Sequence, residues 1–461
     1  MNFINRTNEL ADLEKRWKSG KPELFIVYGK RRVGKTELVK KFIQGKPAIY
    51  FLADKRTMID QLREVSRLVG EAFGDPLIEK QGFGDWLEVF RYLQRNSKKR
   101  CILVVDEFPY LAEVDSAASS VFQKGWDEYL RAQQSMLILM GSSIAMMESE
   151  TLIQKAPLFG RRTGQLLLQP LSFSQSWQFF PKMSFVDFLE FYAVVGGMPA
   201  YLMQMEGLLS AEENLVAHVL PKTEFLYNEI EFVLKEELRE PKNYLSILRA
   251  ISFGKRKLGE IVNETGIDRT LVNKYLHTLA QLLIVERELP VTEKNPVKSR
   301  KGLYRLCDNF FRFWFQYVFP YKSDLEIGRH NEVLRKFREQ FNMLTAIAYE
   351  EVCRELAPTW QDQLFPFERV GKWWDKNEEI DVVAINQREN QILLGECKWS
   401  EKPVGTNIYE SLKKKAQLVD WGLEGREERY ILFSKSGFTA DMKKIAREEK
   451  VLLVEKDRLM V

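Results

Sequence analysis

The first third of the chain alternates short apolar runs with stretches of helical periodicity. Apolar runs stand at 23–28, 101–105 and 136–140, and a polar or glycine-rich turn follows each of them. A run of this length between turn residues is typical of a strand that is buried on both faces, as in a parallel sheet covered by helices. The pattern therefore predicts an N-terminal α/β domain built on a parallel sheet.

Three helical stripes follow one another between residues 244 and 291. The first has leucine or isoleucine at 245, 248 and 251, and the second has apolar residues at 258, 261 and 262 before Gly266 ends it. Asp268 is suited to cap a third helix. The buried side of that helix would carry Val272, Tyr275, Leu276 and Leu279. An apolar strand and a returning segment come next, so the pattern predicts a winged helix-turn-helix.

The last third begins with a dense aromatic segment, YRLCDNFFRFWFQYVFPY (304–321), which predicts a core helix bundle. Helical spacing then continues through 333–356. Two strands follow at 379–385 and 391–399, and the polar turn NQREN between them indicates a hairpin. The order of elements predicts a mixed α/β domain at the C-terminus.

Composition narrows the class of protein. The chain has 461 residues, 45% hydrophobic and 29% charged, as in a globular protein of several domains. It has no apolar run of about 18 residues and no apolar signal core, so we expect a cytoplasmic protein without a membrane partner. Four isolated cysteines and three isolated histidines argue against zinc and disulfides. Any metal would be held by carboxylate oxygens, which suits magnesium, with manganese as the alternative.

The turn after the first apolar run predicts a phosphate-binding loop. Its residues fit the spacing GxxxxGK(S/T), with Gly29, Lys30, Arg31, Arg32, Val33, Gly34, Lys35 and Thr36 in order. Glycines allow backbone N–H groups to surround phosphate oxygens, and the helix that follows adds its positive end. Lys35 would reach the β and γ phosphates, and the Thr36 hydroxyl would bind magnesium.

The other two strands end in residues that suit ATP hydrolysis. Asp106 would hold the magnesium ion through water, and Glu107 would polarise the attacking water. Ser142 or Ser143 could sense the γ-phosphate from the neighbouring strand. Arg161 and Arg162 are candidates to stabilise charge on the transferring phosphoryl group, although an exposed basic turn is an equally simple interpretation.

Six segments together resemble a known family. They are FINRTNEL, GKRRVGKT, VVDEFPYL, LMGSS, GRRT and GGMPAYL, and their order is that of the archaeal-type ATPases of the AAA-like STAND group. The resemblance covers about residues 1–235. It implies that Arg6, within Phe3–Arg6, lies near the adenine, and that GGMPAYL is a lid motif. It also implies that ATP is bound, hydrolysed and used as a switch.

The winged helix carries the strongest local charge. The net charge of the chain is +4, but residues 241–300 contain 11 Lys or Arg and six Asp or Glu. The outer face of the third helix would present Arg269, Thr270, Asn273 and Lys274 to a DNA groove and its phosphates. A module that contacts protein, or that only spaces two domains, is the alternative.

The strand QILLGECKW places Glu396 and Lys398 on one face, and Asp381 on the preceding strand can converge with them. Two carboxylates can hold magnesium beside a phosphodiester, and a lysine can position the attacking water. Glu350, on the helix before, would complete the metal shell. This set resembles the PD-(D/E)xK nuclease fold, and more closely the domain of unknown function that follows such ATPases. The alternative is a retained fold with a surface ion pair.

We therefore expect four parts: a P-loop ATPase core (1–170), a helical lid (171–235), a winged helix (236–298) and a PD-(D/E)xK nuclease-like domain (304–461). The leading hypothesis is an ATP-binding and ATP-hydrolysing switch coupled to a magnesium-dependent nuclease that acts on DNA. The first alternative is an ATP-regulated adaptor that binds DNA or protein and has a non-catalytic C-terminal domain. The second is an ADP-locked assembly switch. The sequence leaves open whether the protein forms a homo-oligomer, because arginines that take part in catalysis often act between subunits.

Overall fold

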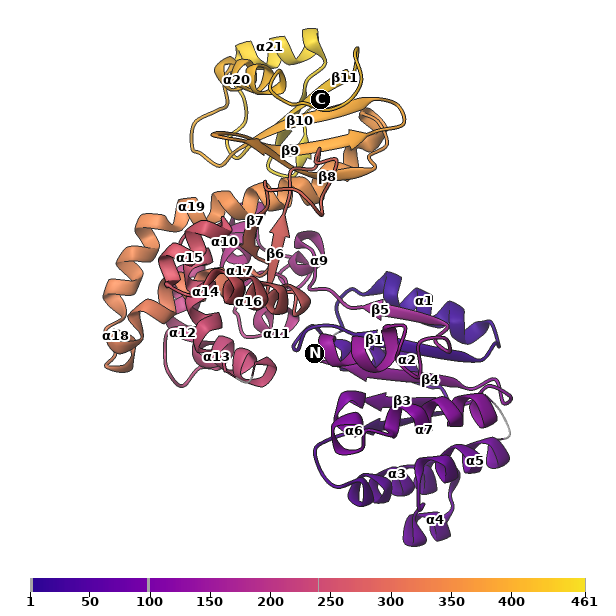
Figure 1. The fold of residues 1–461 in the computed structure, drawn as a ribbon. Helices are drawn as coiled ribbons and strands as arrows, with labels where there is room; N and C mark the ends of the chain where they lie inside the picture. The colour runs from indigo at the N-terminus through magenta and orange to yellow at the C-terminus, as the bar shows by residue number, and fades with distance from the viewer. Residues whose placement is uncertain (1–2, 98–99, 239, 461) are drawn as a thin grey trace. The chain divides into compact units, whose positions relative to one another are not determined.

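The computed structural model describes residues 3–97, 100–238 and 240–460 (Figure 1). It divides into two compact units. The first comprises residues 1–171 with 198–200, and the second comprises residues 172–197 with 201–461. The predicted core boundary at residue 170 lies beside this division, whereas the predicted lid, winged helix and C-terminal domain fall into one unit.

A five-stranded parallel sheet forms the centre of the first unit, in the order β2-β3-β4-β1-β5. All residues of β1, β3 and β4 are buried, which explains their continuous apolar sequence. The strands are β1 (Glu23–Tyr28), β2 (Ala48–Leu52), β3 (Ile102–Asp106), β4 (Met136–Gly141) and β5 (Gly164–Leu167). The predicted α/β fold with a parallel sheet is thus confirmed.

Helices connect these strands. They are α1 (Thr7–Lys18), α2 (Lys35–Ile43), α3 (Met58–Phe73), α4 (Pro76–Gln81), α5 (Trp86–Asn96), α6 (Phe108–Val114), α7 (Ala118–Gly125) and α8 (Ile144–Met147), with π-helical turns η1 (Trp126–Leu130) and η2 (Glu148–Leu152). Their starts follow ordinary capping chemistry, since Thr57 caps α3 and Asp85 caps α5 through backbone N–H groups.

The second unit begins with short helices around a buried aromatic segment. These helices are α9 (Phe173–Trp177), α10 (Phe185–Val195), α11 (Pro199–Leu202), α12 (Ala211–His218) and α13 (Phe225–Glu237). The aromatic segment forms α17 (Asn309–Phe313), η3 (Trp314–Val318), η4 (Phe319–Tyr321) and α18 (Lys322–Glu326). Helix α17 packs on α10, so this part of the predicted C-terminal domain belongs with the lid helices.

Trp314→Ala is expected to lower the free energy of unfolding by about 3–5 kcal/mol, because it empties a large buried site. The Trp314 side chain is fully buried, and its indole N–H donates to the Tyr227 carbonyl at 2.8 Å. Denaturant unfolding followed by circular dichroism measures the change. Phe253→Ala is the matched control, because Phe253 is 52% exposed. Equal losses in the two variants would contradict this account of the core.

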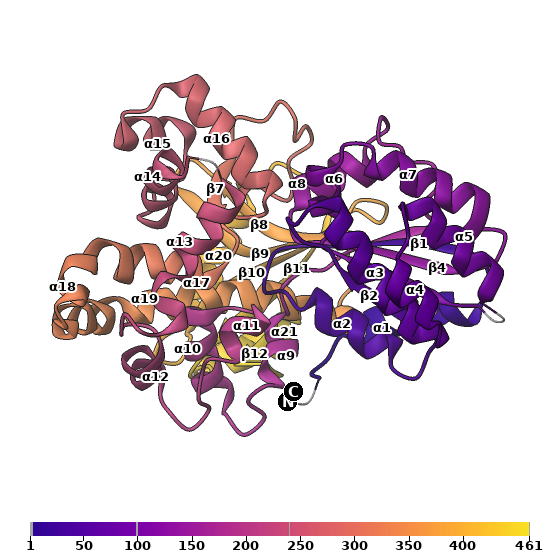
Figure 2. The same cartoon turned by 90° about the horizontal axis from the view of Figure 1, so that it is seen from below.

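The winged helix follows the predicted order. Helices α14 (Lys242–Ser252), α15 (Leu258–Thr265) and α16 (Arg269–Gln281) pack together, as Figure 2 shows, and β6 (Val285–Glu288) pairs antiparallel with β7 (Leu303–Leu306). Strand β7 extends the module past the predicted boundary at residue 298. The wing is therefore the loop 289–302 between the two strands.

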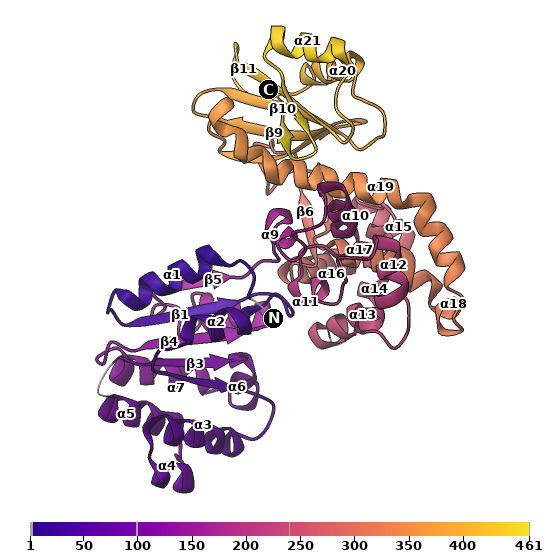
Figure 3. The ribbon, with the colours of Figure 1, turned by 180° about the vertical axis from the view of Figure 1, so that it is seen from behind.

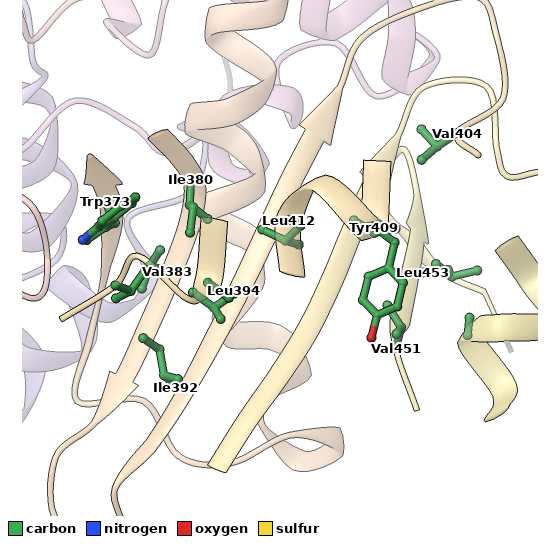
Figure 4. Packing of buried hydrophobic residues seen from close by; sticks show 14 of the residues in the cluster. Trp373, Ile380, Val383, Ile392, Leu394, Val404, Tyr409, Leu412, Val451 and Leu453 are labelled. Atoms are coloured by element: carbon green, nitrogen blue, oxygen red, sulfur yellow. The ribbon is translucent and has the colours of Figure 1, made fainter. Parts of the chain in front are cut away.

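The C-terminal part holds a six-stranded mixed sheet in the order β13-β12-β11-β10-β9-β8. Its strands are β8 (Arg369–Asp375), β9 (Glu378–Asn386), β10 (Gln391–Lys398), β11 (Glu427–Ser434), β12 (Leu452–Glu455) and β13 (Arg458–Leu459). Helices α20 (Thr406–Ala416) and α21 (Ala440–Glu449) pack beside it. Figure 4 shows the apolar core between them, where Leu394, Leu412 and Ile380 are fully buried.

A long helix connects the two halves of the second unit. Helix α19 (His330–Leu356) contacts α10 and η3 and also contacts β9 and β10, as Figure 3 shows, and the 3₁₀ turn η5 (Ala357–Gln363) ends it. Its 27 residues span about 40 Å at 1.5 Å per residue. Among the helices that the structure describes, none is long and apolar enough to cross a membrane.

The wing is not a free loop. Val291 is buried in the same apolar cluster as Trp373 of β8, and its N–H donates to the Lys372 carbonyl at 2.8 Å. Lys301 forms an ion pair with Asp375 at 2.9 Å, and the Trp374 indole donates to the Lys301 carbonyl. This segment of the wing therefore packs on the C-terminal sheet.

Candidate functional site

The loop between β1 and α2 has the backbone that a phosphate cradle needs. Gly29 has φ +150° and Gly34 has φ +92°, and both conformations disfavour residues with a side chain. A Cβ on Gly29 would lie 2.4 Å from the Leu168 carbonyl oxygen, so the loop passes directly against the end of β5. Helix α2 begins at Lys35, which brings its positive N-terminal end to the loop.

Lys35 lies inside this loop. Its side chain is buried, and Nζ donates to the carbonyl oxygens of Gly29 and Lys30 at 2.9 Å each. The ammonium group therefore lies at the loop in which the sequence predicts phosphate binding. Arg31, also predicted here, donates from Nη2 to the Tyr110 hydroxyl at 2.9 Å.

The two predicted magnesium ligands are neighbours. The Thr36 hydroxyl donates to Asp106 Oδ2 at 2.8 Å, and the Tyr50 hydroxyl donates to the same oxygen. A hydroxyl and a carboxylate at the head of the loop fit the oxygen ligands that magnesium prefers. Tyr50 was not predicted. Tyr50 lies at the middle of β2, next to β3. This contact can be inferred from the sequence only when the order of the strands is known.

Glu107 lies where β3 and β4 end side by side. It follows β3 with φ +53°, and its carboxylate accepts the Ser142 N–H at 3.0 Å and the Ser142 hydroxyl. Of the two serines proposed from the sequence, Ser142 therefore contacts Glu107. Ser143 is the N-cap residue of α8 and makes no side-chain cap bond there.

Ser142→Ala is expected to slow ATP hydrolysis by up to about tenfold, because one hydrogen bond that holds Glu107 contributes about 1 kcal/mol. Nucleotide affinity should not change. Phosphate release under saturating ATP measures the rate, and Ser143→Ala is the matched control. A slower Ser143→Ala with an unaffected Ser142→Ala would show that the wrong serine has been assigned.

Arg6 is buried beside the phosphate loop. Its Nη2 donates to the Val33 carbonyl at 3.1 Å and to the Gln169 carbonyl at 2.7 Å, and Nη1 pairs with Glu9. The guanidinium thus ties the N-terminal segment to the loop and to the segment after β5. The structure places Arg6 beside the phosphate loop, and its location near the adenine stays a prediction.

Arg161 and Arg162 lie at a different edge of the sheet. They precede β5, whose first residue, Gly164, pairs with Phe25 near the start of β1, whereas the cradle follows the end of β1. Arg161 pairs with Asp127 at 3.2 Å, and Arg162 donates to the Leu152 carbonyl. The structure gives both arginines these contacts, and their assignment to the nucleotide site stays a prediction.

The acidic residues of the C-terminal sheet converge where β9 and β10 separate. Ladder pairing ends at Gly395 and Val382, one position before Asp381 and Glu396 would face each other. Asp381 Oδ2 accepts the Cys397 N–H at 3.0 Å. Glu396 accepts from Lys398 at 2.8 Å, as the alternation along the strand predicted, so the three residues lie together.

Two lysines surround Glu396. Lys415 of α20 lies 3.1 Å from its carboxylate, opposite Lys398. The side chain of Glu396 is 9% exposed and that of Lys415 17%, whereas that of Lys398 is 36% exposed and reaches solvent. Lys415 was not predicted. It is one of three consecutive lysines on α20, and the sequence does not show which of them turns inward.

Negative charge is concentrated at Asp381. Burial raises the pKa of Asp381 to about 7, with further contributions from the charges of Glu350 and Glu396. Burial by itself lowers the pKa of Lys398, but the charge and hydrogen bond of Glu396 outweigh it and the pKa is raised. The site thus holds closely spaced carboxylates next to a protonated lysine.

Glu350 does not complete a metal shell. Helix α19 presents its carboxylate to Lys372 of β8, with which it forms a close ion pair. Within residues 3–97, 100–238 and 240–460, no group of three or more His, Cys, Asp or Glu side chains is arranged to hold a metal ion. The prediction of Glu350 as third ligand is corrected, and the oxygens that remain for a cation are those of Asp381 and Glu396.

The predicted DNA face of the winged helix is accessible. Asp268 caps α16 through the N–H groups of Thr270 and Leu271. Arg269, Thr270, Asn273 and Lys274 are all exposed on this helix. The wing also carries exposed basic residues, at Lys294, Lys298 and Arg300.

Two families match the chain. Residues 3–205 match an ATPase domain found predominantly in Archaea, and residues 314–415 match archaeal and bacterial proteins of unknown function. The first match covers the cradle, Asp106, Glu107 and Ser142. The second covers Glu350, Asp381, Glu396 and Lys398.

Related proteins extend over nearly the whole length. An uncharacterised protein of Methanocaldococcus jannaschii is 34% identical over 438 residues, which is 94% of this chain and 95% of that protein. An uncharacterised ATP-binding protein of the same organism is 54% identical over 44 residues, 10% of this chain and 75% of its own. A Walker-type ATPase of Pyrococcus abyssi superposes with a TM-score of 0.53 at 19% identity, covering 68% of this chain and 96% of that one. The superposition shows that the Pyrococcus abyssi ATPase and this chain share a fold.

Proposed function

Because this chain belongs to the family of archaeal-type ATPases that carry a C-terminal domain of unknown function, we propose that it is an ATP-hydrolysing switch coupled to a magnesium-dependent nuclease acting on DNA. The P-loop ATPase domain accounts for ATP binding. The nuclease part rests on one observation, which is the convergence of Asp381, Glu396 and Lys398 where two strands separate.

Hydrolysis is assigned to the residues at the ends of β3 and β4. Thr36 and Asp106 would hold magnesium, which neutralises charge on the β and γ phosphates when bound. Lys35 binds the same phosphates, and the helix α2 adds its N-terminal dipole. Glu107, held by Ser142, orients a water molecule toward the γ-phosphate and accepts its proton.

Cleavage of a phosphodiester is assigned to the C-terminal cluster. Asp381 and Glu396 would hold magnesium, which polarises the scissile phosphate when bound. Lys398 directs its ammonium toward the same place, where it orients the attacking water and offsets charge that grows on the phosphate oxygens. The pKa of Asp381, raised by burial and the nearby carboxylates, supports a cation as the missing counter-charge.

The test of the nuclease is a panel of single-stranded, duplex and branched DNA and of RNA, incubated with the full chain with and without ATP. Cleavage is expected in magnesium and not in EDTA. Glu396→Gln should lose it, while Glu410→Gln, an exposed residue of α20, should retain it. Absence of cleavage on every substrate by the unaltered protein would reject the nuclease.

DNA contact is assigned to α16. Lys274→Ala is expected to weaken duplex binding by a similar factor on every sequence and to reduce the salt slope of log K by about 1, as loss of one phosphate contact does. Fluorescence anisotropy over a salt series measures both quantities. Lys443→Ala, an exposed lysine of α21, should leave the slope unchanged, and equal slopes in all three proteins would argue against α16.

A second candidate function is an ATP-regulated adaptor whose C-terminal domain does not cut. The observation that favours it is the pairing of Glu396 with both Lys398 and Lys415, which already neutralises that carboxylate. Manganese diffraction from soaked crystals separates the two. An anomalous peak between Asp381 and Glu396 supports the nuclease, and a featureless site in fully soaked crystals supports the adaptor.

A further inference from the structure

A separate cavity of about 130 Å³ belongs to the second unit, and Glu396 is not among its lining residues. It is enclosed by the end of α14, the hairpin β6–β7, the segment α17–η3, α19 and the start of β8. The winged helix, the aromatic bundle and the C-terminal sheet thus all contribute walls. Figure 1 shows β7, α19 and β8 together at this junction.

Cations dominate the lining of this cavity. The positive residues are Arg256, Arg305, Arg312, Arg354 and Lys372, whereas the carboxylates are Glu288 and Glu351 alone. Arg256 pairs with Glu288 at 2.8 Å, and Arg305 and Arg312 both pair with Glu351 at 2.9 Å. The lining therefore carries three more positive than negative groups.

Arg312 has an unused donor at this place. It is 7% exposed, and its Nη2 bonds Glu351, but its Nη1 is buried and has no hydrogen-bond partner. A buried N–H without a partner is uncommon in folded proteins and calls for an explanation. Arg354 also lines the cavity, and its Nη1 donates to the Asp381 carbonyl at 2.9 Å.

The arginines of the cavity lower the pKa of the carboxylate that lies between them. Burial alone would raise the pKa of Glu351, yet Arg312, Arg305 and Arg354 lower it to about 2. Glu351 is therefore an anion that the cluster already holds. A second anion would find the remaining guanidinium donors directed at it.

We propose that this cavity binds the phosphate group of a small phosphorylated ligand, or inorganic phosphate itself. Guanidinium groups match the geometry of phosphate oxygens and form paired, charge-assisted hydrogen bonds with them. The volume holds a phosphate group but is smaller than the 300–1,000 Å³ typical of whole-ligand pockets, so the rest of a larger ligand would protrude. Arg312 Nη1 supplies the buried donor, and Arg256 and Arg354 approach from other walls.

Such a ligand would act on the C-terminal domain through two side chains. Arg354 lines the cavity and bonds the backbone of Asp381, and Lys372 lines it and pairs with Glu350. A bound anion would interact with both Arg354 and Lys372. The site would thereby report the presence of a phosphorylated molecule to the acidic cluster, independently of whether that cluster cuts DNA.

Isothermal titration of the full chain with inorganic phosphate tests the proposal, with magnesium and ADP in excess so that the phosphate loop is filled. We expect one further binding event per chain. Arg312→Gln and Arg256→Gln should each weaken it about tenfold, since each removes a charge-assisted hydrogen bond. Arg329→Gln, whose side chain is 72% exposed on a distant turn, should bind as the unaltered chain does.

Glu351→Gln gives the opposite expectation. Removing this carboxylate frees donors on Arg305 and Arg312 and takes away a negative charge, so phosphate should bind about tenfold more tightly. A purely structural ion cluster would not gain affinity. If Arg312→Gln does not fold by thermal melting, Arg256→Gln and Glu351→Gln decide the question between them.

Two outcomes would overturn the proposal. They are the absence of a second phosphate event and equal affinity in the Arg256 and Glu351 variants. Ribose 5-phosphate binding more tightly than phosphate would assign the site to a phosphorylated metabolite. Phosphate binding as tightly would assign it to the free ion. Both results support the site, and neither depends on the nuclease assay.

Discussion

Lys35→Ala is expected to weaken ATP binding by about 100-fold or more. The ammonium lies inside the loop, where it donates to the carbonyls of Gly29 and Lys30. With nucleotide bound, the same charge would meet the β and γ phosphates. Hydrogen bonds to charged groups contribute about 1.5–3 kcal/mol each, so the loss of two of them reaches this magnitude.

Titration with a non-hydrolysable ATP analogue and magnesium measures the effect. Lys41→Ala is the matched control, because Lys41 lies on the same helix and is exposed. The variant should keep its circular dichroism spectrum, since the surrounding strands stay buried. Near-normal affinity in Lys35→Ala would show that the loop does not hold the phosphates as described.

Asp381→Asn is expected to abolish magnesium-dependent DNA cleavage, with a loss of at least about 100-fold, because the proposed function makes Asp381 a direct metal ligand and not only a supporting contact. The amide has the same shape, and its oxygen can still accept the Cys397 N–H. ATP binding should persist, because the nucleotide residues belong to the other unit.

Cleavage gels with radiolabelled DNA and ATP titration of the same preparation check both parts. Asp441→Asn, an exposed residue of α21, controls for the loss of one carboxylate from this domain. A variant that cuts as fast as the unaltered chain would remove Asp381 from the mechanism. A variant that loses both activities would indicate misfolding instead.

Much of the ATPase part could be predicted because its determinants are contiguous. Gly29 to Thr36 form one loop, and the buried strands before Asp106 and Ser142 are continuous apolar runs. In a parallel sheet the ends of neighbouring strands meet, so the contact of Glu107 with Ser142 follows from strand order. The alternation along β10 likewise placed Glu396 and Lys398 on one face.

The residues that were missed are brought in by distant parts of the chain. Lys415 and Lys372 reach Glu396 and Glu350 from α20 and β8, and neither pairing has a local signal. Arg161 and Arg162 belong to a segment whose place in the sequence matches the ATPase family. They directly precede β5, whose first residue pairs with Phe25 near the start of β1. The packing of the wing on β8 could not be predicted either, because nothing in the sequence distinguishes Val291 from other apolar residues.

The contact of the wing with β8 has a consequence for any cutting reaction. Val291 and Lys301 join the winged helix to the sheet that carries Glu396, and α19 braces the same junction. A DNA duplex bound by α16 would place the same backbone position beside Asp381 and Glu396 in every binding event. Cleavage should then produce fragment ends that lie a constant number of base pairs from the bound sequence.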